Sequence, residues 1–290
     1  MTWFPSGGSV GTFLQPAHMA DLGESLRDLA TETEVHVLGS GSNTLFSGDR
    51  FDGVVVYLGE RFGGFEILPD RSIRAGAGAL TAEVAKSAMA QGLDITFLGA
   101  VPGTIGGAIA GNAGFLGKNI CDYVVRATVV LRDGSVQTLK RATFANPGER
   151  VVALKGAIMI QAVLSLPEGE PDDLQKSLAQ TMQQHRAIFP EVSLCTGHVF
   201  SAHSADPEGG EQQSPLERAA QILRRLGDFR QEGANLYLDR AFPNIIFAED
   251  ASDAAKLKWF GDKIRNICCR EFNENLAWSL NVVGNGCLSR

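Results

Sequence analysis

Three glycine-rich segments, set among short apolar runs, constrain this chain more than any other feature. They are residues 39–44 (GSGSNT), 76–79 (GAGA) and 97–117 (FLGAVPGTIGGAIAGNAGFLG). Glycine has no Cβ, so the backbone N–H groups of such loops can come close to an anion or a flat ring. The repeated pattern therefore predicts a cofactor that lies along the backbone of this half of the chain.

Taken alone, the first of these loops permits two interpretations. Residues 39–43 form either a tight turn that needs positive φ, or a cradle in which backbone, serine and asparagine donors bind a pyrophosphate. Neither the glycine spacing nor the following residues fit the dinucleotide fingerprint of a Rossmann unit. The two later glycine segments favour the cradle.

Up to residue 166, strand-length apolar runs alternate with helical patterns. In one helical pattern, Thr81 is a candidate N-cap and Gly92 a candidate stop. Asp133 and Gly134 predict a hairpin turn between two strands. The expected strands cover 35–38, 53–59, 64–70, 72–79, 123–139 and 157–166, and the expected helices cover 19–33 and 80–93.

The second half reads as a different unit. A run rich in Pro, Glu and Asp at 166–173 interrupts the chain, and a long helix pattern near 252–272 has Ser252 as its candidate cap. The sequence therefore predicts three parts, 1–167, a linker helix at 168–189, and 190–290. The other expected helices here are 172–189 and 215–229, and the expected strands are 234–238, 243–248 and 276–284.

Charge and composition limit the classes of partner. The net charge is −7, which argues against a protein whose main partner is nucleic acid or an anionic membrane. No apolar run is long enough to span a membrane, and the first residues lack the pattern of a signal peptide. The five cysteines are unevenly placed and do not suggest a disulfide framework. We expect a cytoplasmic monomer without a metal.

The glycine segments also carry a resemblance. LGSGSNTL, AGAG and FLGAVPGTIGGAIAGNAG, in this order, resemble the UDP-N-acetylenolpyruvoylglucosamine reductase (UDP-N-acetylmuramate dehydrogenase, MurB) family. RAAQILRRLGDFRQEGANLYL and FPNIIFAEDAS resemble its substrate domain. The resemblance implies an α+β fold, in which an FAD-binding domain of the vanillyl-alcohol oxidase/PCMH type is joined to a smaller α/β substrate-type domain.

The resemblance further implies non-covalent FAD, NADPH as a possible reductant and a nucleotide-sugar substrate. The 39–45 loop would hold the pyrophosphate, residues 102–107 and 112–114 would lie against the isoalloxazine and ribityl groups, and residues near Ile120 would line the adenine. The implied FAD residues are Gly39, Ser40, Gly41, Ser42, Asn43, Thr44, Gly78, Pro102, Gly103, Thr104, Gly106, Gly107, Asn112, Gly114 and Ile120.

The catalytic positions of the family hold other residues here. Pro147 stands where the family has an arginine, with Arg150 displaced nearby, and His198 stands where the family has a serine or cysteine proton donor. The family's LEPEVR run corresponds to 276–281, LAWSLN, without its carboxylates or arginine. Two interpretations follow. Either the site is rebuilt, with His198 as proton donor and Arg150 or Arg240 as a candidate carboxylate ligand, or the protein is a non-catalytic FAD- or nucleotide-sugar-binding paralogue.

Overall fold

The computed structural model describes residues 8–48, 50–189, 194–203, 214–231, 234–250 and 256–284. The chain divides into two units, and both are discontinuous in sequence. The larger unit comprises 12–40 and 53–185, and the smaller unit comprises 1–11, 41–52 and 186–290. The three parts expected from the sequence, 1–167, 168–189 and 190–290, stay a prediction beside this division.

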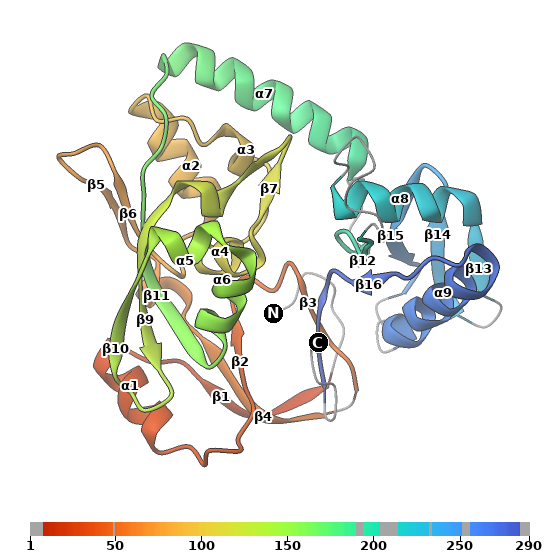
Figure 1. Cartoon of the computed structure of the whole chain (residues 1–290), viewed down its shortest axis with the longest axis horizontal. Coiled ribbons are helices and arrows are strands. Elements are labelled where there is room, and N and C mark those ends of the chain that lie inside the picture. Colours follow the sequence, from red (N-terminus) through yellow and green to blue (C-terminus); the bar gives the residue numbers. More distant parts are fainter. Residues whose placement is uncertain are drawn as a thin grey trace. The chain divides into compact units, whose positions relative to one another are not determined.

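A five-stranded antiparallel sheet is the centre of the larger unit. Its order is β10 (Val136–Lys140), β9 (Val124–Leu131), β11 (Ala157–Leu164), β6 (Ile73–Gly76) and β5 (Phe65–Ile67) (Figure 1). A second sheet has the order β1 (Ser9–Leu14), β4 (Arg50–Tyr57) and β2 (Val35–Leu38), in which β2 pairs in parallel with β4. The five-stranded sheet is rich in valine, isoleucine and alanine and the second sheet is rich in valine, as expected for strands with a buried face.

Helices connect these strands, and several of them contribute to the same hydrophobic core. Residues of α2 and α4 belong to the same hydrophobic core as β6, β9 and β11, with Val84, Ile105 and Ile109 fully buried. The helices are α1 (Met19–Arg27), η1 (Gly59–Phe62), α2 (Thr81–Ala90), α3 (Thr96–Gly99), α4 (Ile105–Gly111), η2 (Ile120–Tyr123), α5 (Arg141–Ala145), α6 (Pro147–Leu154) and α7 (Pro171–Ile188), with the hairpin β7 (Gly114–Phe115) and β8 (Lys118–Asn119) after α4.

Local predictions in this unit are mostly confirmed. Gly134 has φ of 76° in the β9–β10 turn, and Gly92 has φ of 71° directly after the C-cap of α2. The prediction of Thr81 as the N-cap is wrong, because Leu80 occupies that position and Thr81 is the first helical residue. The hydroxyl of Thr81 donates instead to the carbonyl of Val101 at 2.6 Å. It therefore anchors the following loop to α2.

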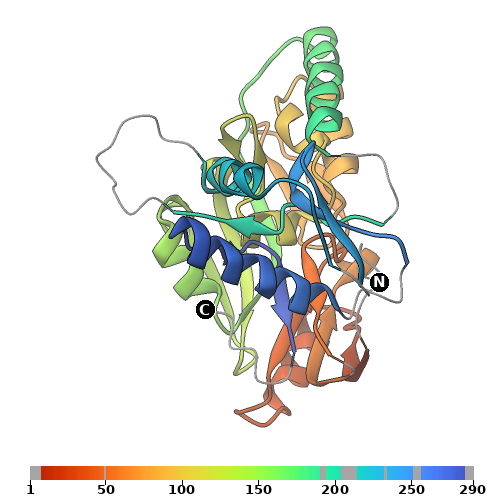
Figure 2. The same cartoon turned by 90° about the vertical axis from the view of Figure 1, so that its right-hand side faces the viewer.

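The smaller unit contains a three-stranded antiparallel sheet of β13 (Phe229–Gln231), β14 (Ala234–Asp239) and β15 (Phe242–Ala248). Helices α8 (Pro215–Leu226) and α9 (Leu257–Phe272) lie next to this sheet (Figure 2) and share its hydrophobic core. The long helix expected from 252 is observed from Leu257, and its candidate cap Ser252 lies outside the described residues.

The single closing strand expected at 276–284 is two strands in two different sheets. β16 (Ala277–Trp278) pairs with β12 (Phe200–Ser201), whereas β17 (Asn281–Val283) pairs in parallel with β3 (Thr44–Phe46). The apolar pattern of the segment shows that it is extended, but it contains nothing that identifies a change of partner.

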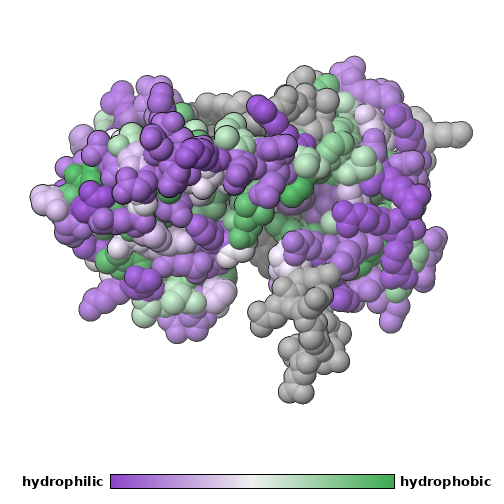
Figure 3. All heavy atoms as spheres, turned by 90° about the horizontal axis from the view of Figure 1, so that it is seen from above, coloured by the Kyte–Doolittle hydropathy of each residue, from purple (hydrophilic) through white to green (hydrophobic). Residues whose placement is uncertain are grey.

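Hydrophilic residues cover most of the face drawn in Figure 3, while the apolar side chains collect in separate buried clusters. Among the described residues, no helix is both long and apolar enough to cross a bilayer.

Candidate functional site

In the larger unit, backbone hydrogen bonds hold two of the predicted cofactor segments together. Ile105 N–H donates to the carbonyl of Ala79 at 2.8 Å, and Gly106 N–H donates to that of Ala77 at 2.9 Å. These bonds fix the start of α4 against the 76–79 loop. Thr104 caps the helix by accepting a hydrogen bond from Gly107 N–H.

Glycine is required here for packing as well as for any ligand. A Cβ placed on Gly78 would overlap the carbonyl of Gly59. A Cβ on Gly39 would lie 2.7 Å from Thr104 Oγ1, and one on Gly106 would lie 2.7 Å from Ala77 Cβ. The first and third glycine segments therefore meet at Gly39 and Thr104, and the second and third meet at Ala77 and Gly106, at distances that leave no room for a side chain on either glycine.

Ser40 provides an observation that bears on the cofactor. Its Oγ is buried and has no hydrogen-bond partner within the described part of the chain. A buried hydroxyl normally finds a partner, and leaving it unpaired costs about 1–3 kcal/mol. An oxygen-rich anionic group at the 39–44 loop would satisfy it, so these residues fit the pyrophosphate of FAD.

The remaining predicted FAD residues of this unit differ in exposure. Pro102, Gly107 and Gly114 are exposed, whereas Ile120 is fully buried in the core. Asn112 ends α4 with φ of 50° and accepts a hydrogen bond through Oδ1 from the N–H of residue 121 at 3.3 Å. Gly103 has φ of 148°. Their contacts with a cofactor stay predictions.

Arg150, the candidate carboxylate ligand, lies on α6 with its side chain directed inward. It is 8% exposed, and its Nε has no hydrogen-bond partner among the described residues. Burial raises the pKa of the neighbouring Cys121 thiol, and the Arg150 guanidinium partly offsets that rise. Arg150 is thus a buried cation beside a neutral thiol.

In the smaller unit, the second half of the first glycine loop is fixed by a strand from the far end of the chain. Gly41 has φ of 71°, a conformation that favours glycine. Asn43 Nδ2 donates to the carbonyl of Ser279 at 3.0 Å, and Asn281 N–H donates to the carbonyl of Asn43 at 2.9 Å. Thr44 then pairs with Asn281 as β3 begins.

The residues just before β17 contact the segment that carries His198. Phe200 pairs with Trp278 across β12 and β16, and Ser279 N–H donates to the carbonyl of Val199 at 2.8 Å. His198 is half-buried, and its ring centroid lies 4.6 Å from that of Phe189. The segment with the predicted proton donor, His198, and the 276–284 segment are therefore adjacent in this unit.

A hollow of about 10 Å³ lies where these segments meet. It is lined by Gly41, Ser42, Thr44, Leu45, Thr196, Gly197, Leu257 and Leu280. The hollow has room for about one water. It shows that the glycine loop borders the backbone next to His198 within a single unit.

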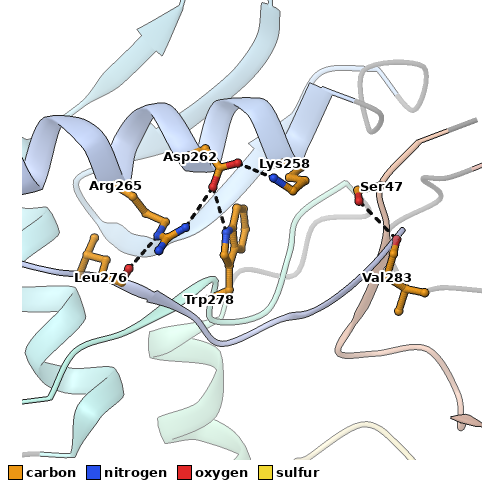
Figure 4. Close-up of polar contacts among 7 residues, drawn as sticks. All are labelled: Ser47, Lys258, Asp262, Arg265, Leu276, Trp278 and Val283. Carbon is orange, nitrogen blue, oxygen red and sulfur yellow. Dashed lines mark hydrogen bonds and ion pairs between the residues drawn. The ribbon is translucent and has the colours of Figure 1, made fainter. Parts of the chain in front are cut away.

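Asp262 of α9 lies at the centre of a hydrogen-bond network that reaches Trp278 of β16 (Figure 4). It accepts hydrogen bonds from Lys258 Nζ at 2.6 Å, Trp278 Nε1 at 3.1 Å and Arg265 Nη1 at 3.1 Å. Arg265 Nε donates to the carbonyl of Leu276 at 2.7 Å. Burial opposes ionisation of Asp262, but the hydrogen bonds from Lys258 and Trp278 outweigh it and hold its pKa below the usual value.

The structure thus groups the predicted site residues in two sets. Gly39, Ser40, Gly78 and the 102–120 residues lie in the larger unit with Arg150, whereas Gly41 to Thr44 lie in the smaller unit with His198. Sequence reasoning missed the role of Asp262, although its spacing from Lys258 (i−4) and Arg265 (i+3) on one helix is typical of an ion-pair network.

Comparisons with known proteins agree with the glycine pattern. Residues 11–140 match the family described as FAD binding domain. The UDP-N-acetylenolpyruvoylglucosamine reductase of Dinoroseobacter shibae is 32% identical over 287 residues, covering 98% of this chain and 92% of that protein. The same enzyme of Paracoccus denitrificans is 30% identical, covering 98% and 93%.

A solved structure extends the likeness to the fold. The crystal structure of UDP-N-acetylenolpyruvylglucosamine reductase (MurB) from Thermus caldophilus is 20% identical, with a TM-score of 0.68, and covers 97% of this chain and 95% of that one. The α+β fold with an FAD-binding domain that the sequence implied is confirmed.

Proposed function

This chain belongs to the UDP-N-acetylenolpyruvoylglucosamine reductase family, which makes it an FAD-binding reductase of peptidoglycan precursor synthesis, and from this premise we propose that His198 donates the proton in its reaction. The observation that carries the proposal is the hydrogen bond from Ser279 N–H to Val199 O at 2.8 Å. It holds the residue after His198 next to the 276–284 segment, and these are the segments that we predict to correspond to the family's proton donor and C-terminal carboxylate.

The reaction asks for two things of the protein. FAD, when bound, supplies hydride to the vinyl carbon of the substrate's enolpyruvyl group. The protein must then stabilise negative charge next to the substrate carboxylate and deliver a proton to the neighbouring carbon. An imidazole is suited to the second task because its ordinary pKa of about 6.5 allows it to hold and release a proton near neutral pH.

The surroundings of His198 favour a fixed ring. Phe189 lies against it at 4.6 Å between centroids, and Val199 next to it is fully buried. A ring confined in this way loses little entropy on presenting its proton to a substrate. Backbone bonds on both sides of the strand pair, at Asn43 and at Val199, support the same arrangement.

The FAD residues proposed are those of the glycine segments. Ser40 Oγ, Asn43 and the backbone N–H groups of the 39–44 loop would hold the pyrophosphate, and the 102–114 residues would contact the rest of the cofactor. The unpaired Ser40 Oγ and the crowding at Gly39, Gly78 and Gly106 support this assignment. NADPH is the reductant proposed, in keeping with the family.

Arg150 is the proposed second catalytic residue, as a ligand of the substrate carboxylate. Because its side chain is 8% exposed, this role requires that the guanidinium become accessible when substrate binds. In that case Arg150→Lys keeps much of the substrate affinity, whereas Arg150→Gln raises KM. A purely structural role predicts instead that both variants lower the free energy of unfolding and leave KM unchanged.

The test of the main proposal uses the purified, FAD-loaded protein under anaerobic conditions. NADPH should bleach the flavin absorbance, and UDP-N-acetylglucosamine enolpyruvate should restore it. His198→Ala should slow the second step by about 100-fold or more, in the range of general acid catalysis. His198→Ser, which restores the family residue, should lose much less.

His203→Ala is the matched control, because it removes an exposed histidine of the same segment. Equal rates for the His198→Ala variant and the wild-type protein would contradict the role of His198. A flavin that NADPH and the enolpyruvyl substrate both leave unchanged would favour the alternative, a non-catalytic paralogue that binds FAD or a nucleotide sugar.

A further inference from the structure

The five-stranded sheet carries a polar hollow that contains none of the residues proposed for FAD or for catalysis. It measures about 50 Å³ and is lined by Arg74, Arg126, Thr128, Gln161, Ala162 and Val163, all in the larger unit. A single water needs about 10–15 Å³ by this measure. The hollow therefore has room for several waters or for one tetrahedral oxyanion.

Strand register explains why two arginines meet at this place. Val163 of β11 is the partner of Arg74 on β6 and of Arg126 on β9. Gln161, two residues before Val163 and thus on the same face, is the partner of Thr128. Four polar side chains therefore surround Val163, which is only 4% exposed because aliphatic stems of neighbouring side chains can cover it.

These side chains offer hydrogen-bond donors that the described residues do not use. The Arg126 side chain is exposed and forms no hydrogen bond or ion pair with any described residue, and the same residues provide no partner for the side chains of Thr128 and Gln161. Arg74 forms an ion pair through Nε with Glu66 at 3.0 Å, which leaves its terminal nitrogens for another acceptor.

Charge at the hollow is positive although the chain as a whole is negative. Glu66 balances one arginine, and Lys140 on β10 pairs with Arg126 and adds another cation. Asp70 is near enough to Arg126 to respond to its charge, but its carboxylate is bound to Ser72 Oγ at 2.6 Å and forms no ion pair with Arg126. An anionic ligand would therefore meet an unbalanced positive site.

We propose that this hollow binds a phosphate group at a site separate from the flavin and substrate sites. Two guanidinium groups supply charged, forked donors, which match phosphate oxygens well. The amide of Gln161 and the hydroxyl of Thr128 supply neutral donors from the adjacent row. The phosphate is either free inorganic phosphate or the phosphate of a nucleotide.

The experiment measures the thermal midpoint of the FAD-loaded full chain against inorganic phosphate, with sodium chloride keeping the ionic strength constant. The wild-type midpoint should rise and saturate, as for any ligand that binds only the folded state. Arg126→Gln should weaken the apparent affinity by about tenfold, which is the usual effect of losing one charged hydrogen bond. The flavin spectrum should stay unchanged throughout.

Arg61→Gln is the matched control, because Arg61 is an exposed arginine of the same unit outside the hollow. It should behave like the wild-type protein. Thr128→Val, which keeps the shape of the side chain, gives a second variant if Arg126→Gln folds poorly, and it should also weaken binding. A rise without saturation, or equal losses in the Arg126 and Arg61 variants, would overturn the proposal.

A second titration with adenosine 5′-monophosphate distinguishes the two sources of phosphate. Equal affinities for both compounds would identify inorganic phosphate as sufficient. A nucleotide that binds at least tenfold more tightly, and that is weakened equally by Arg126→Gln, would identify the phosphate of a nucleotide as the ligand.

Discussion

The glycine loops of the larger unit and the contact of the 199–200 and 277–279 segments in the smaller unit place different demands on the sequence. At Gly39, Gly78 and Gly106 the requirement is the absence of a side chain, since a Cβ would meet another segment. At the contact in the smaller unit, backbone bonds such as Ser279 N–H to Val199 O hold the segments together whatever their side chains. The glycine positions therefore restrict the residue type, whereas segments held by backbone bonds leave the residue type free to vary.

Gly78→Ala tests the first half of this comparison and should have the largest effect. The new Cβ would overlap the carbonyl of Gly59, which is backbone and cannot rotate away. We expect a loss of about 3 kcal/mol or more in the free energy of unfolding, together with loss of FAD, measured by urea denaturation and flavin absorbance. In Gly111→Ala, the control, the added methyl group meets nothing within 4 Å, and an equal loss there would contradict the explanation.

The pH dependence of stability should reveal His36, on the strand that leads into the first glycine loop. Burial lowers the pKa of His36 from 6.5 to about 4. In the unfolded chain His36 is protonated below pH 6.5, whereas in the folded chain it is protonated only below about pH 4. The contribution of His36 to the free energy of unfolding is therefore fully present above pH 6.5 and is lost as the pH falls toward 4.

The size of this effect is about 2 kcal/mol between pH 7 and pH 5. Urea denaturation of His36→Leu and of the wild-type protein at both pH values isolates it, because the variant lacks the group. His203→Ala, which removes an exposed histidine, should retain the full pH dependence. A wild-type protein as stable at pH 5 as at pH 7 would contradict the burial of a neutral His36.

Ser40→Ala separates cofactor binding from folding. Removing a buried hydroxyl without a partner should leave the apoprotein as stable as before or slightly more stable. The same change should weaken FAD binding by about tenfold if the cofactor accepts from this hydroxyl. Fluorescence titration of the apoprotein with FAD measures the second effect.

Ser72→Ala provides the contrast to Ser40→Ala. The Ser72 hydroxyl is bonded to Asp70 at 2.6 Å, so its loss should lower stability and leave FAD affinity unchanged. Identical behaviour of the two serine variants would remove the support that Ser40 gives to the pyrophosphate site.

Asp262→Asn should have the smallest effect and tests the second half of the comparison. The amide can still accept from Trp278 but loses the charge that binds Lys258 and Arg265. We expect a loss of about 1 kcal/mol in the free energy of unfolding. Asp173→Asn, which breaks an exposed pair with Lys176, should cost less than about 0.5 kcal/mol.

The sequence predicted those features that depend on near neighbours in the chain. The turn at Asp133 and Gly134 and the stop at Gly92 follow from local backbone chemistry. The split of 276–284 into β16 and β17 was not predictable, because each half pairs with a segment far away in the sequence. The inward direction of Arg150 on α6 was missed for the same reason, since its neighbour Cys121 comes from another element.

The candidate site shows the same limit. Sequence motifs identified the glycine loops, and the resemblance predicts departures from the family pattern at Pro147 and His198. Neither indicated that Val199 and Ser279 exchange a backbone bond or that Asp262 supports Trp278. Those facts depend on three-dimensional register, which local patterns do not encode.

The pairing of β3 with β17 also has a consequence for synthesis on the ribosome. Asn43 bonds to a carbonyl that is added 236 residues later. At ribosomal speeds of about 5–20 residues per second, the segment that begins β3 emerges roughly 10–50 s before its partner strand is made. During most of translation, the glycine loop of the nascent chain therefore lacks the strand with which β3 pairs. The smaller unit can complete its fold only after β17 has been synthesised.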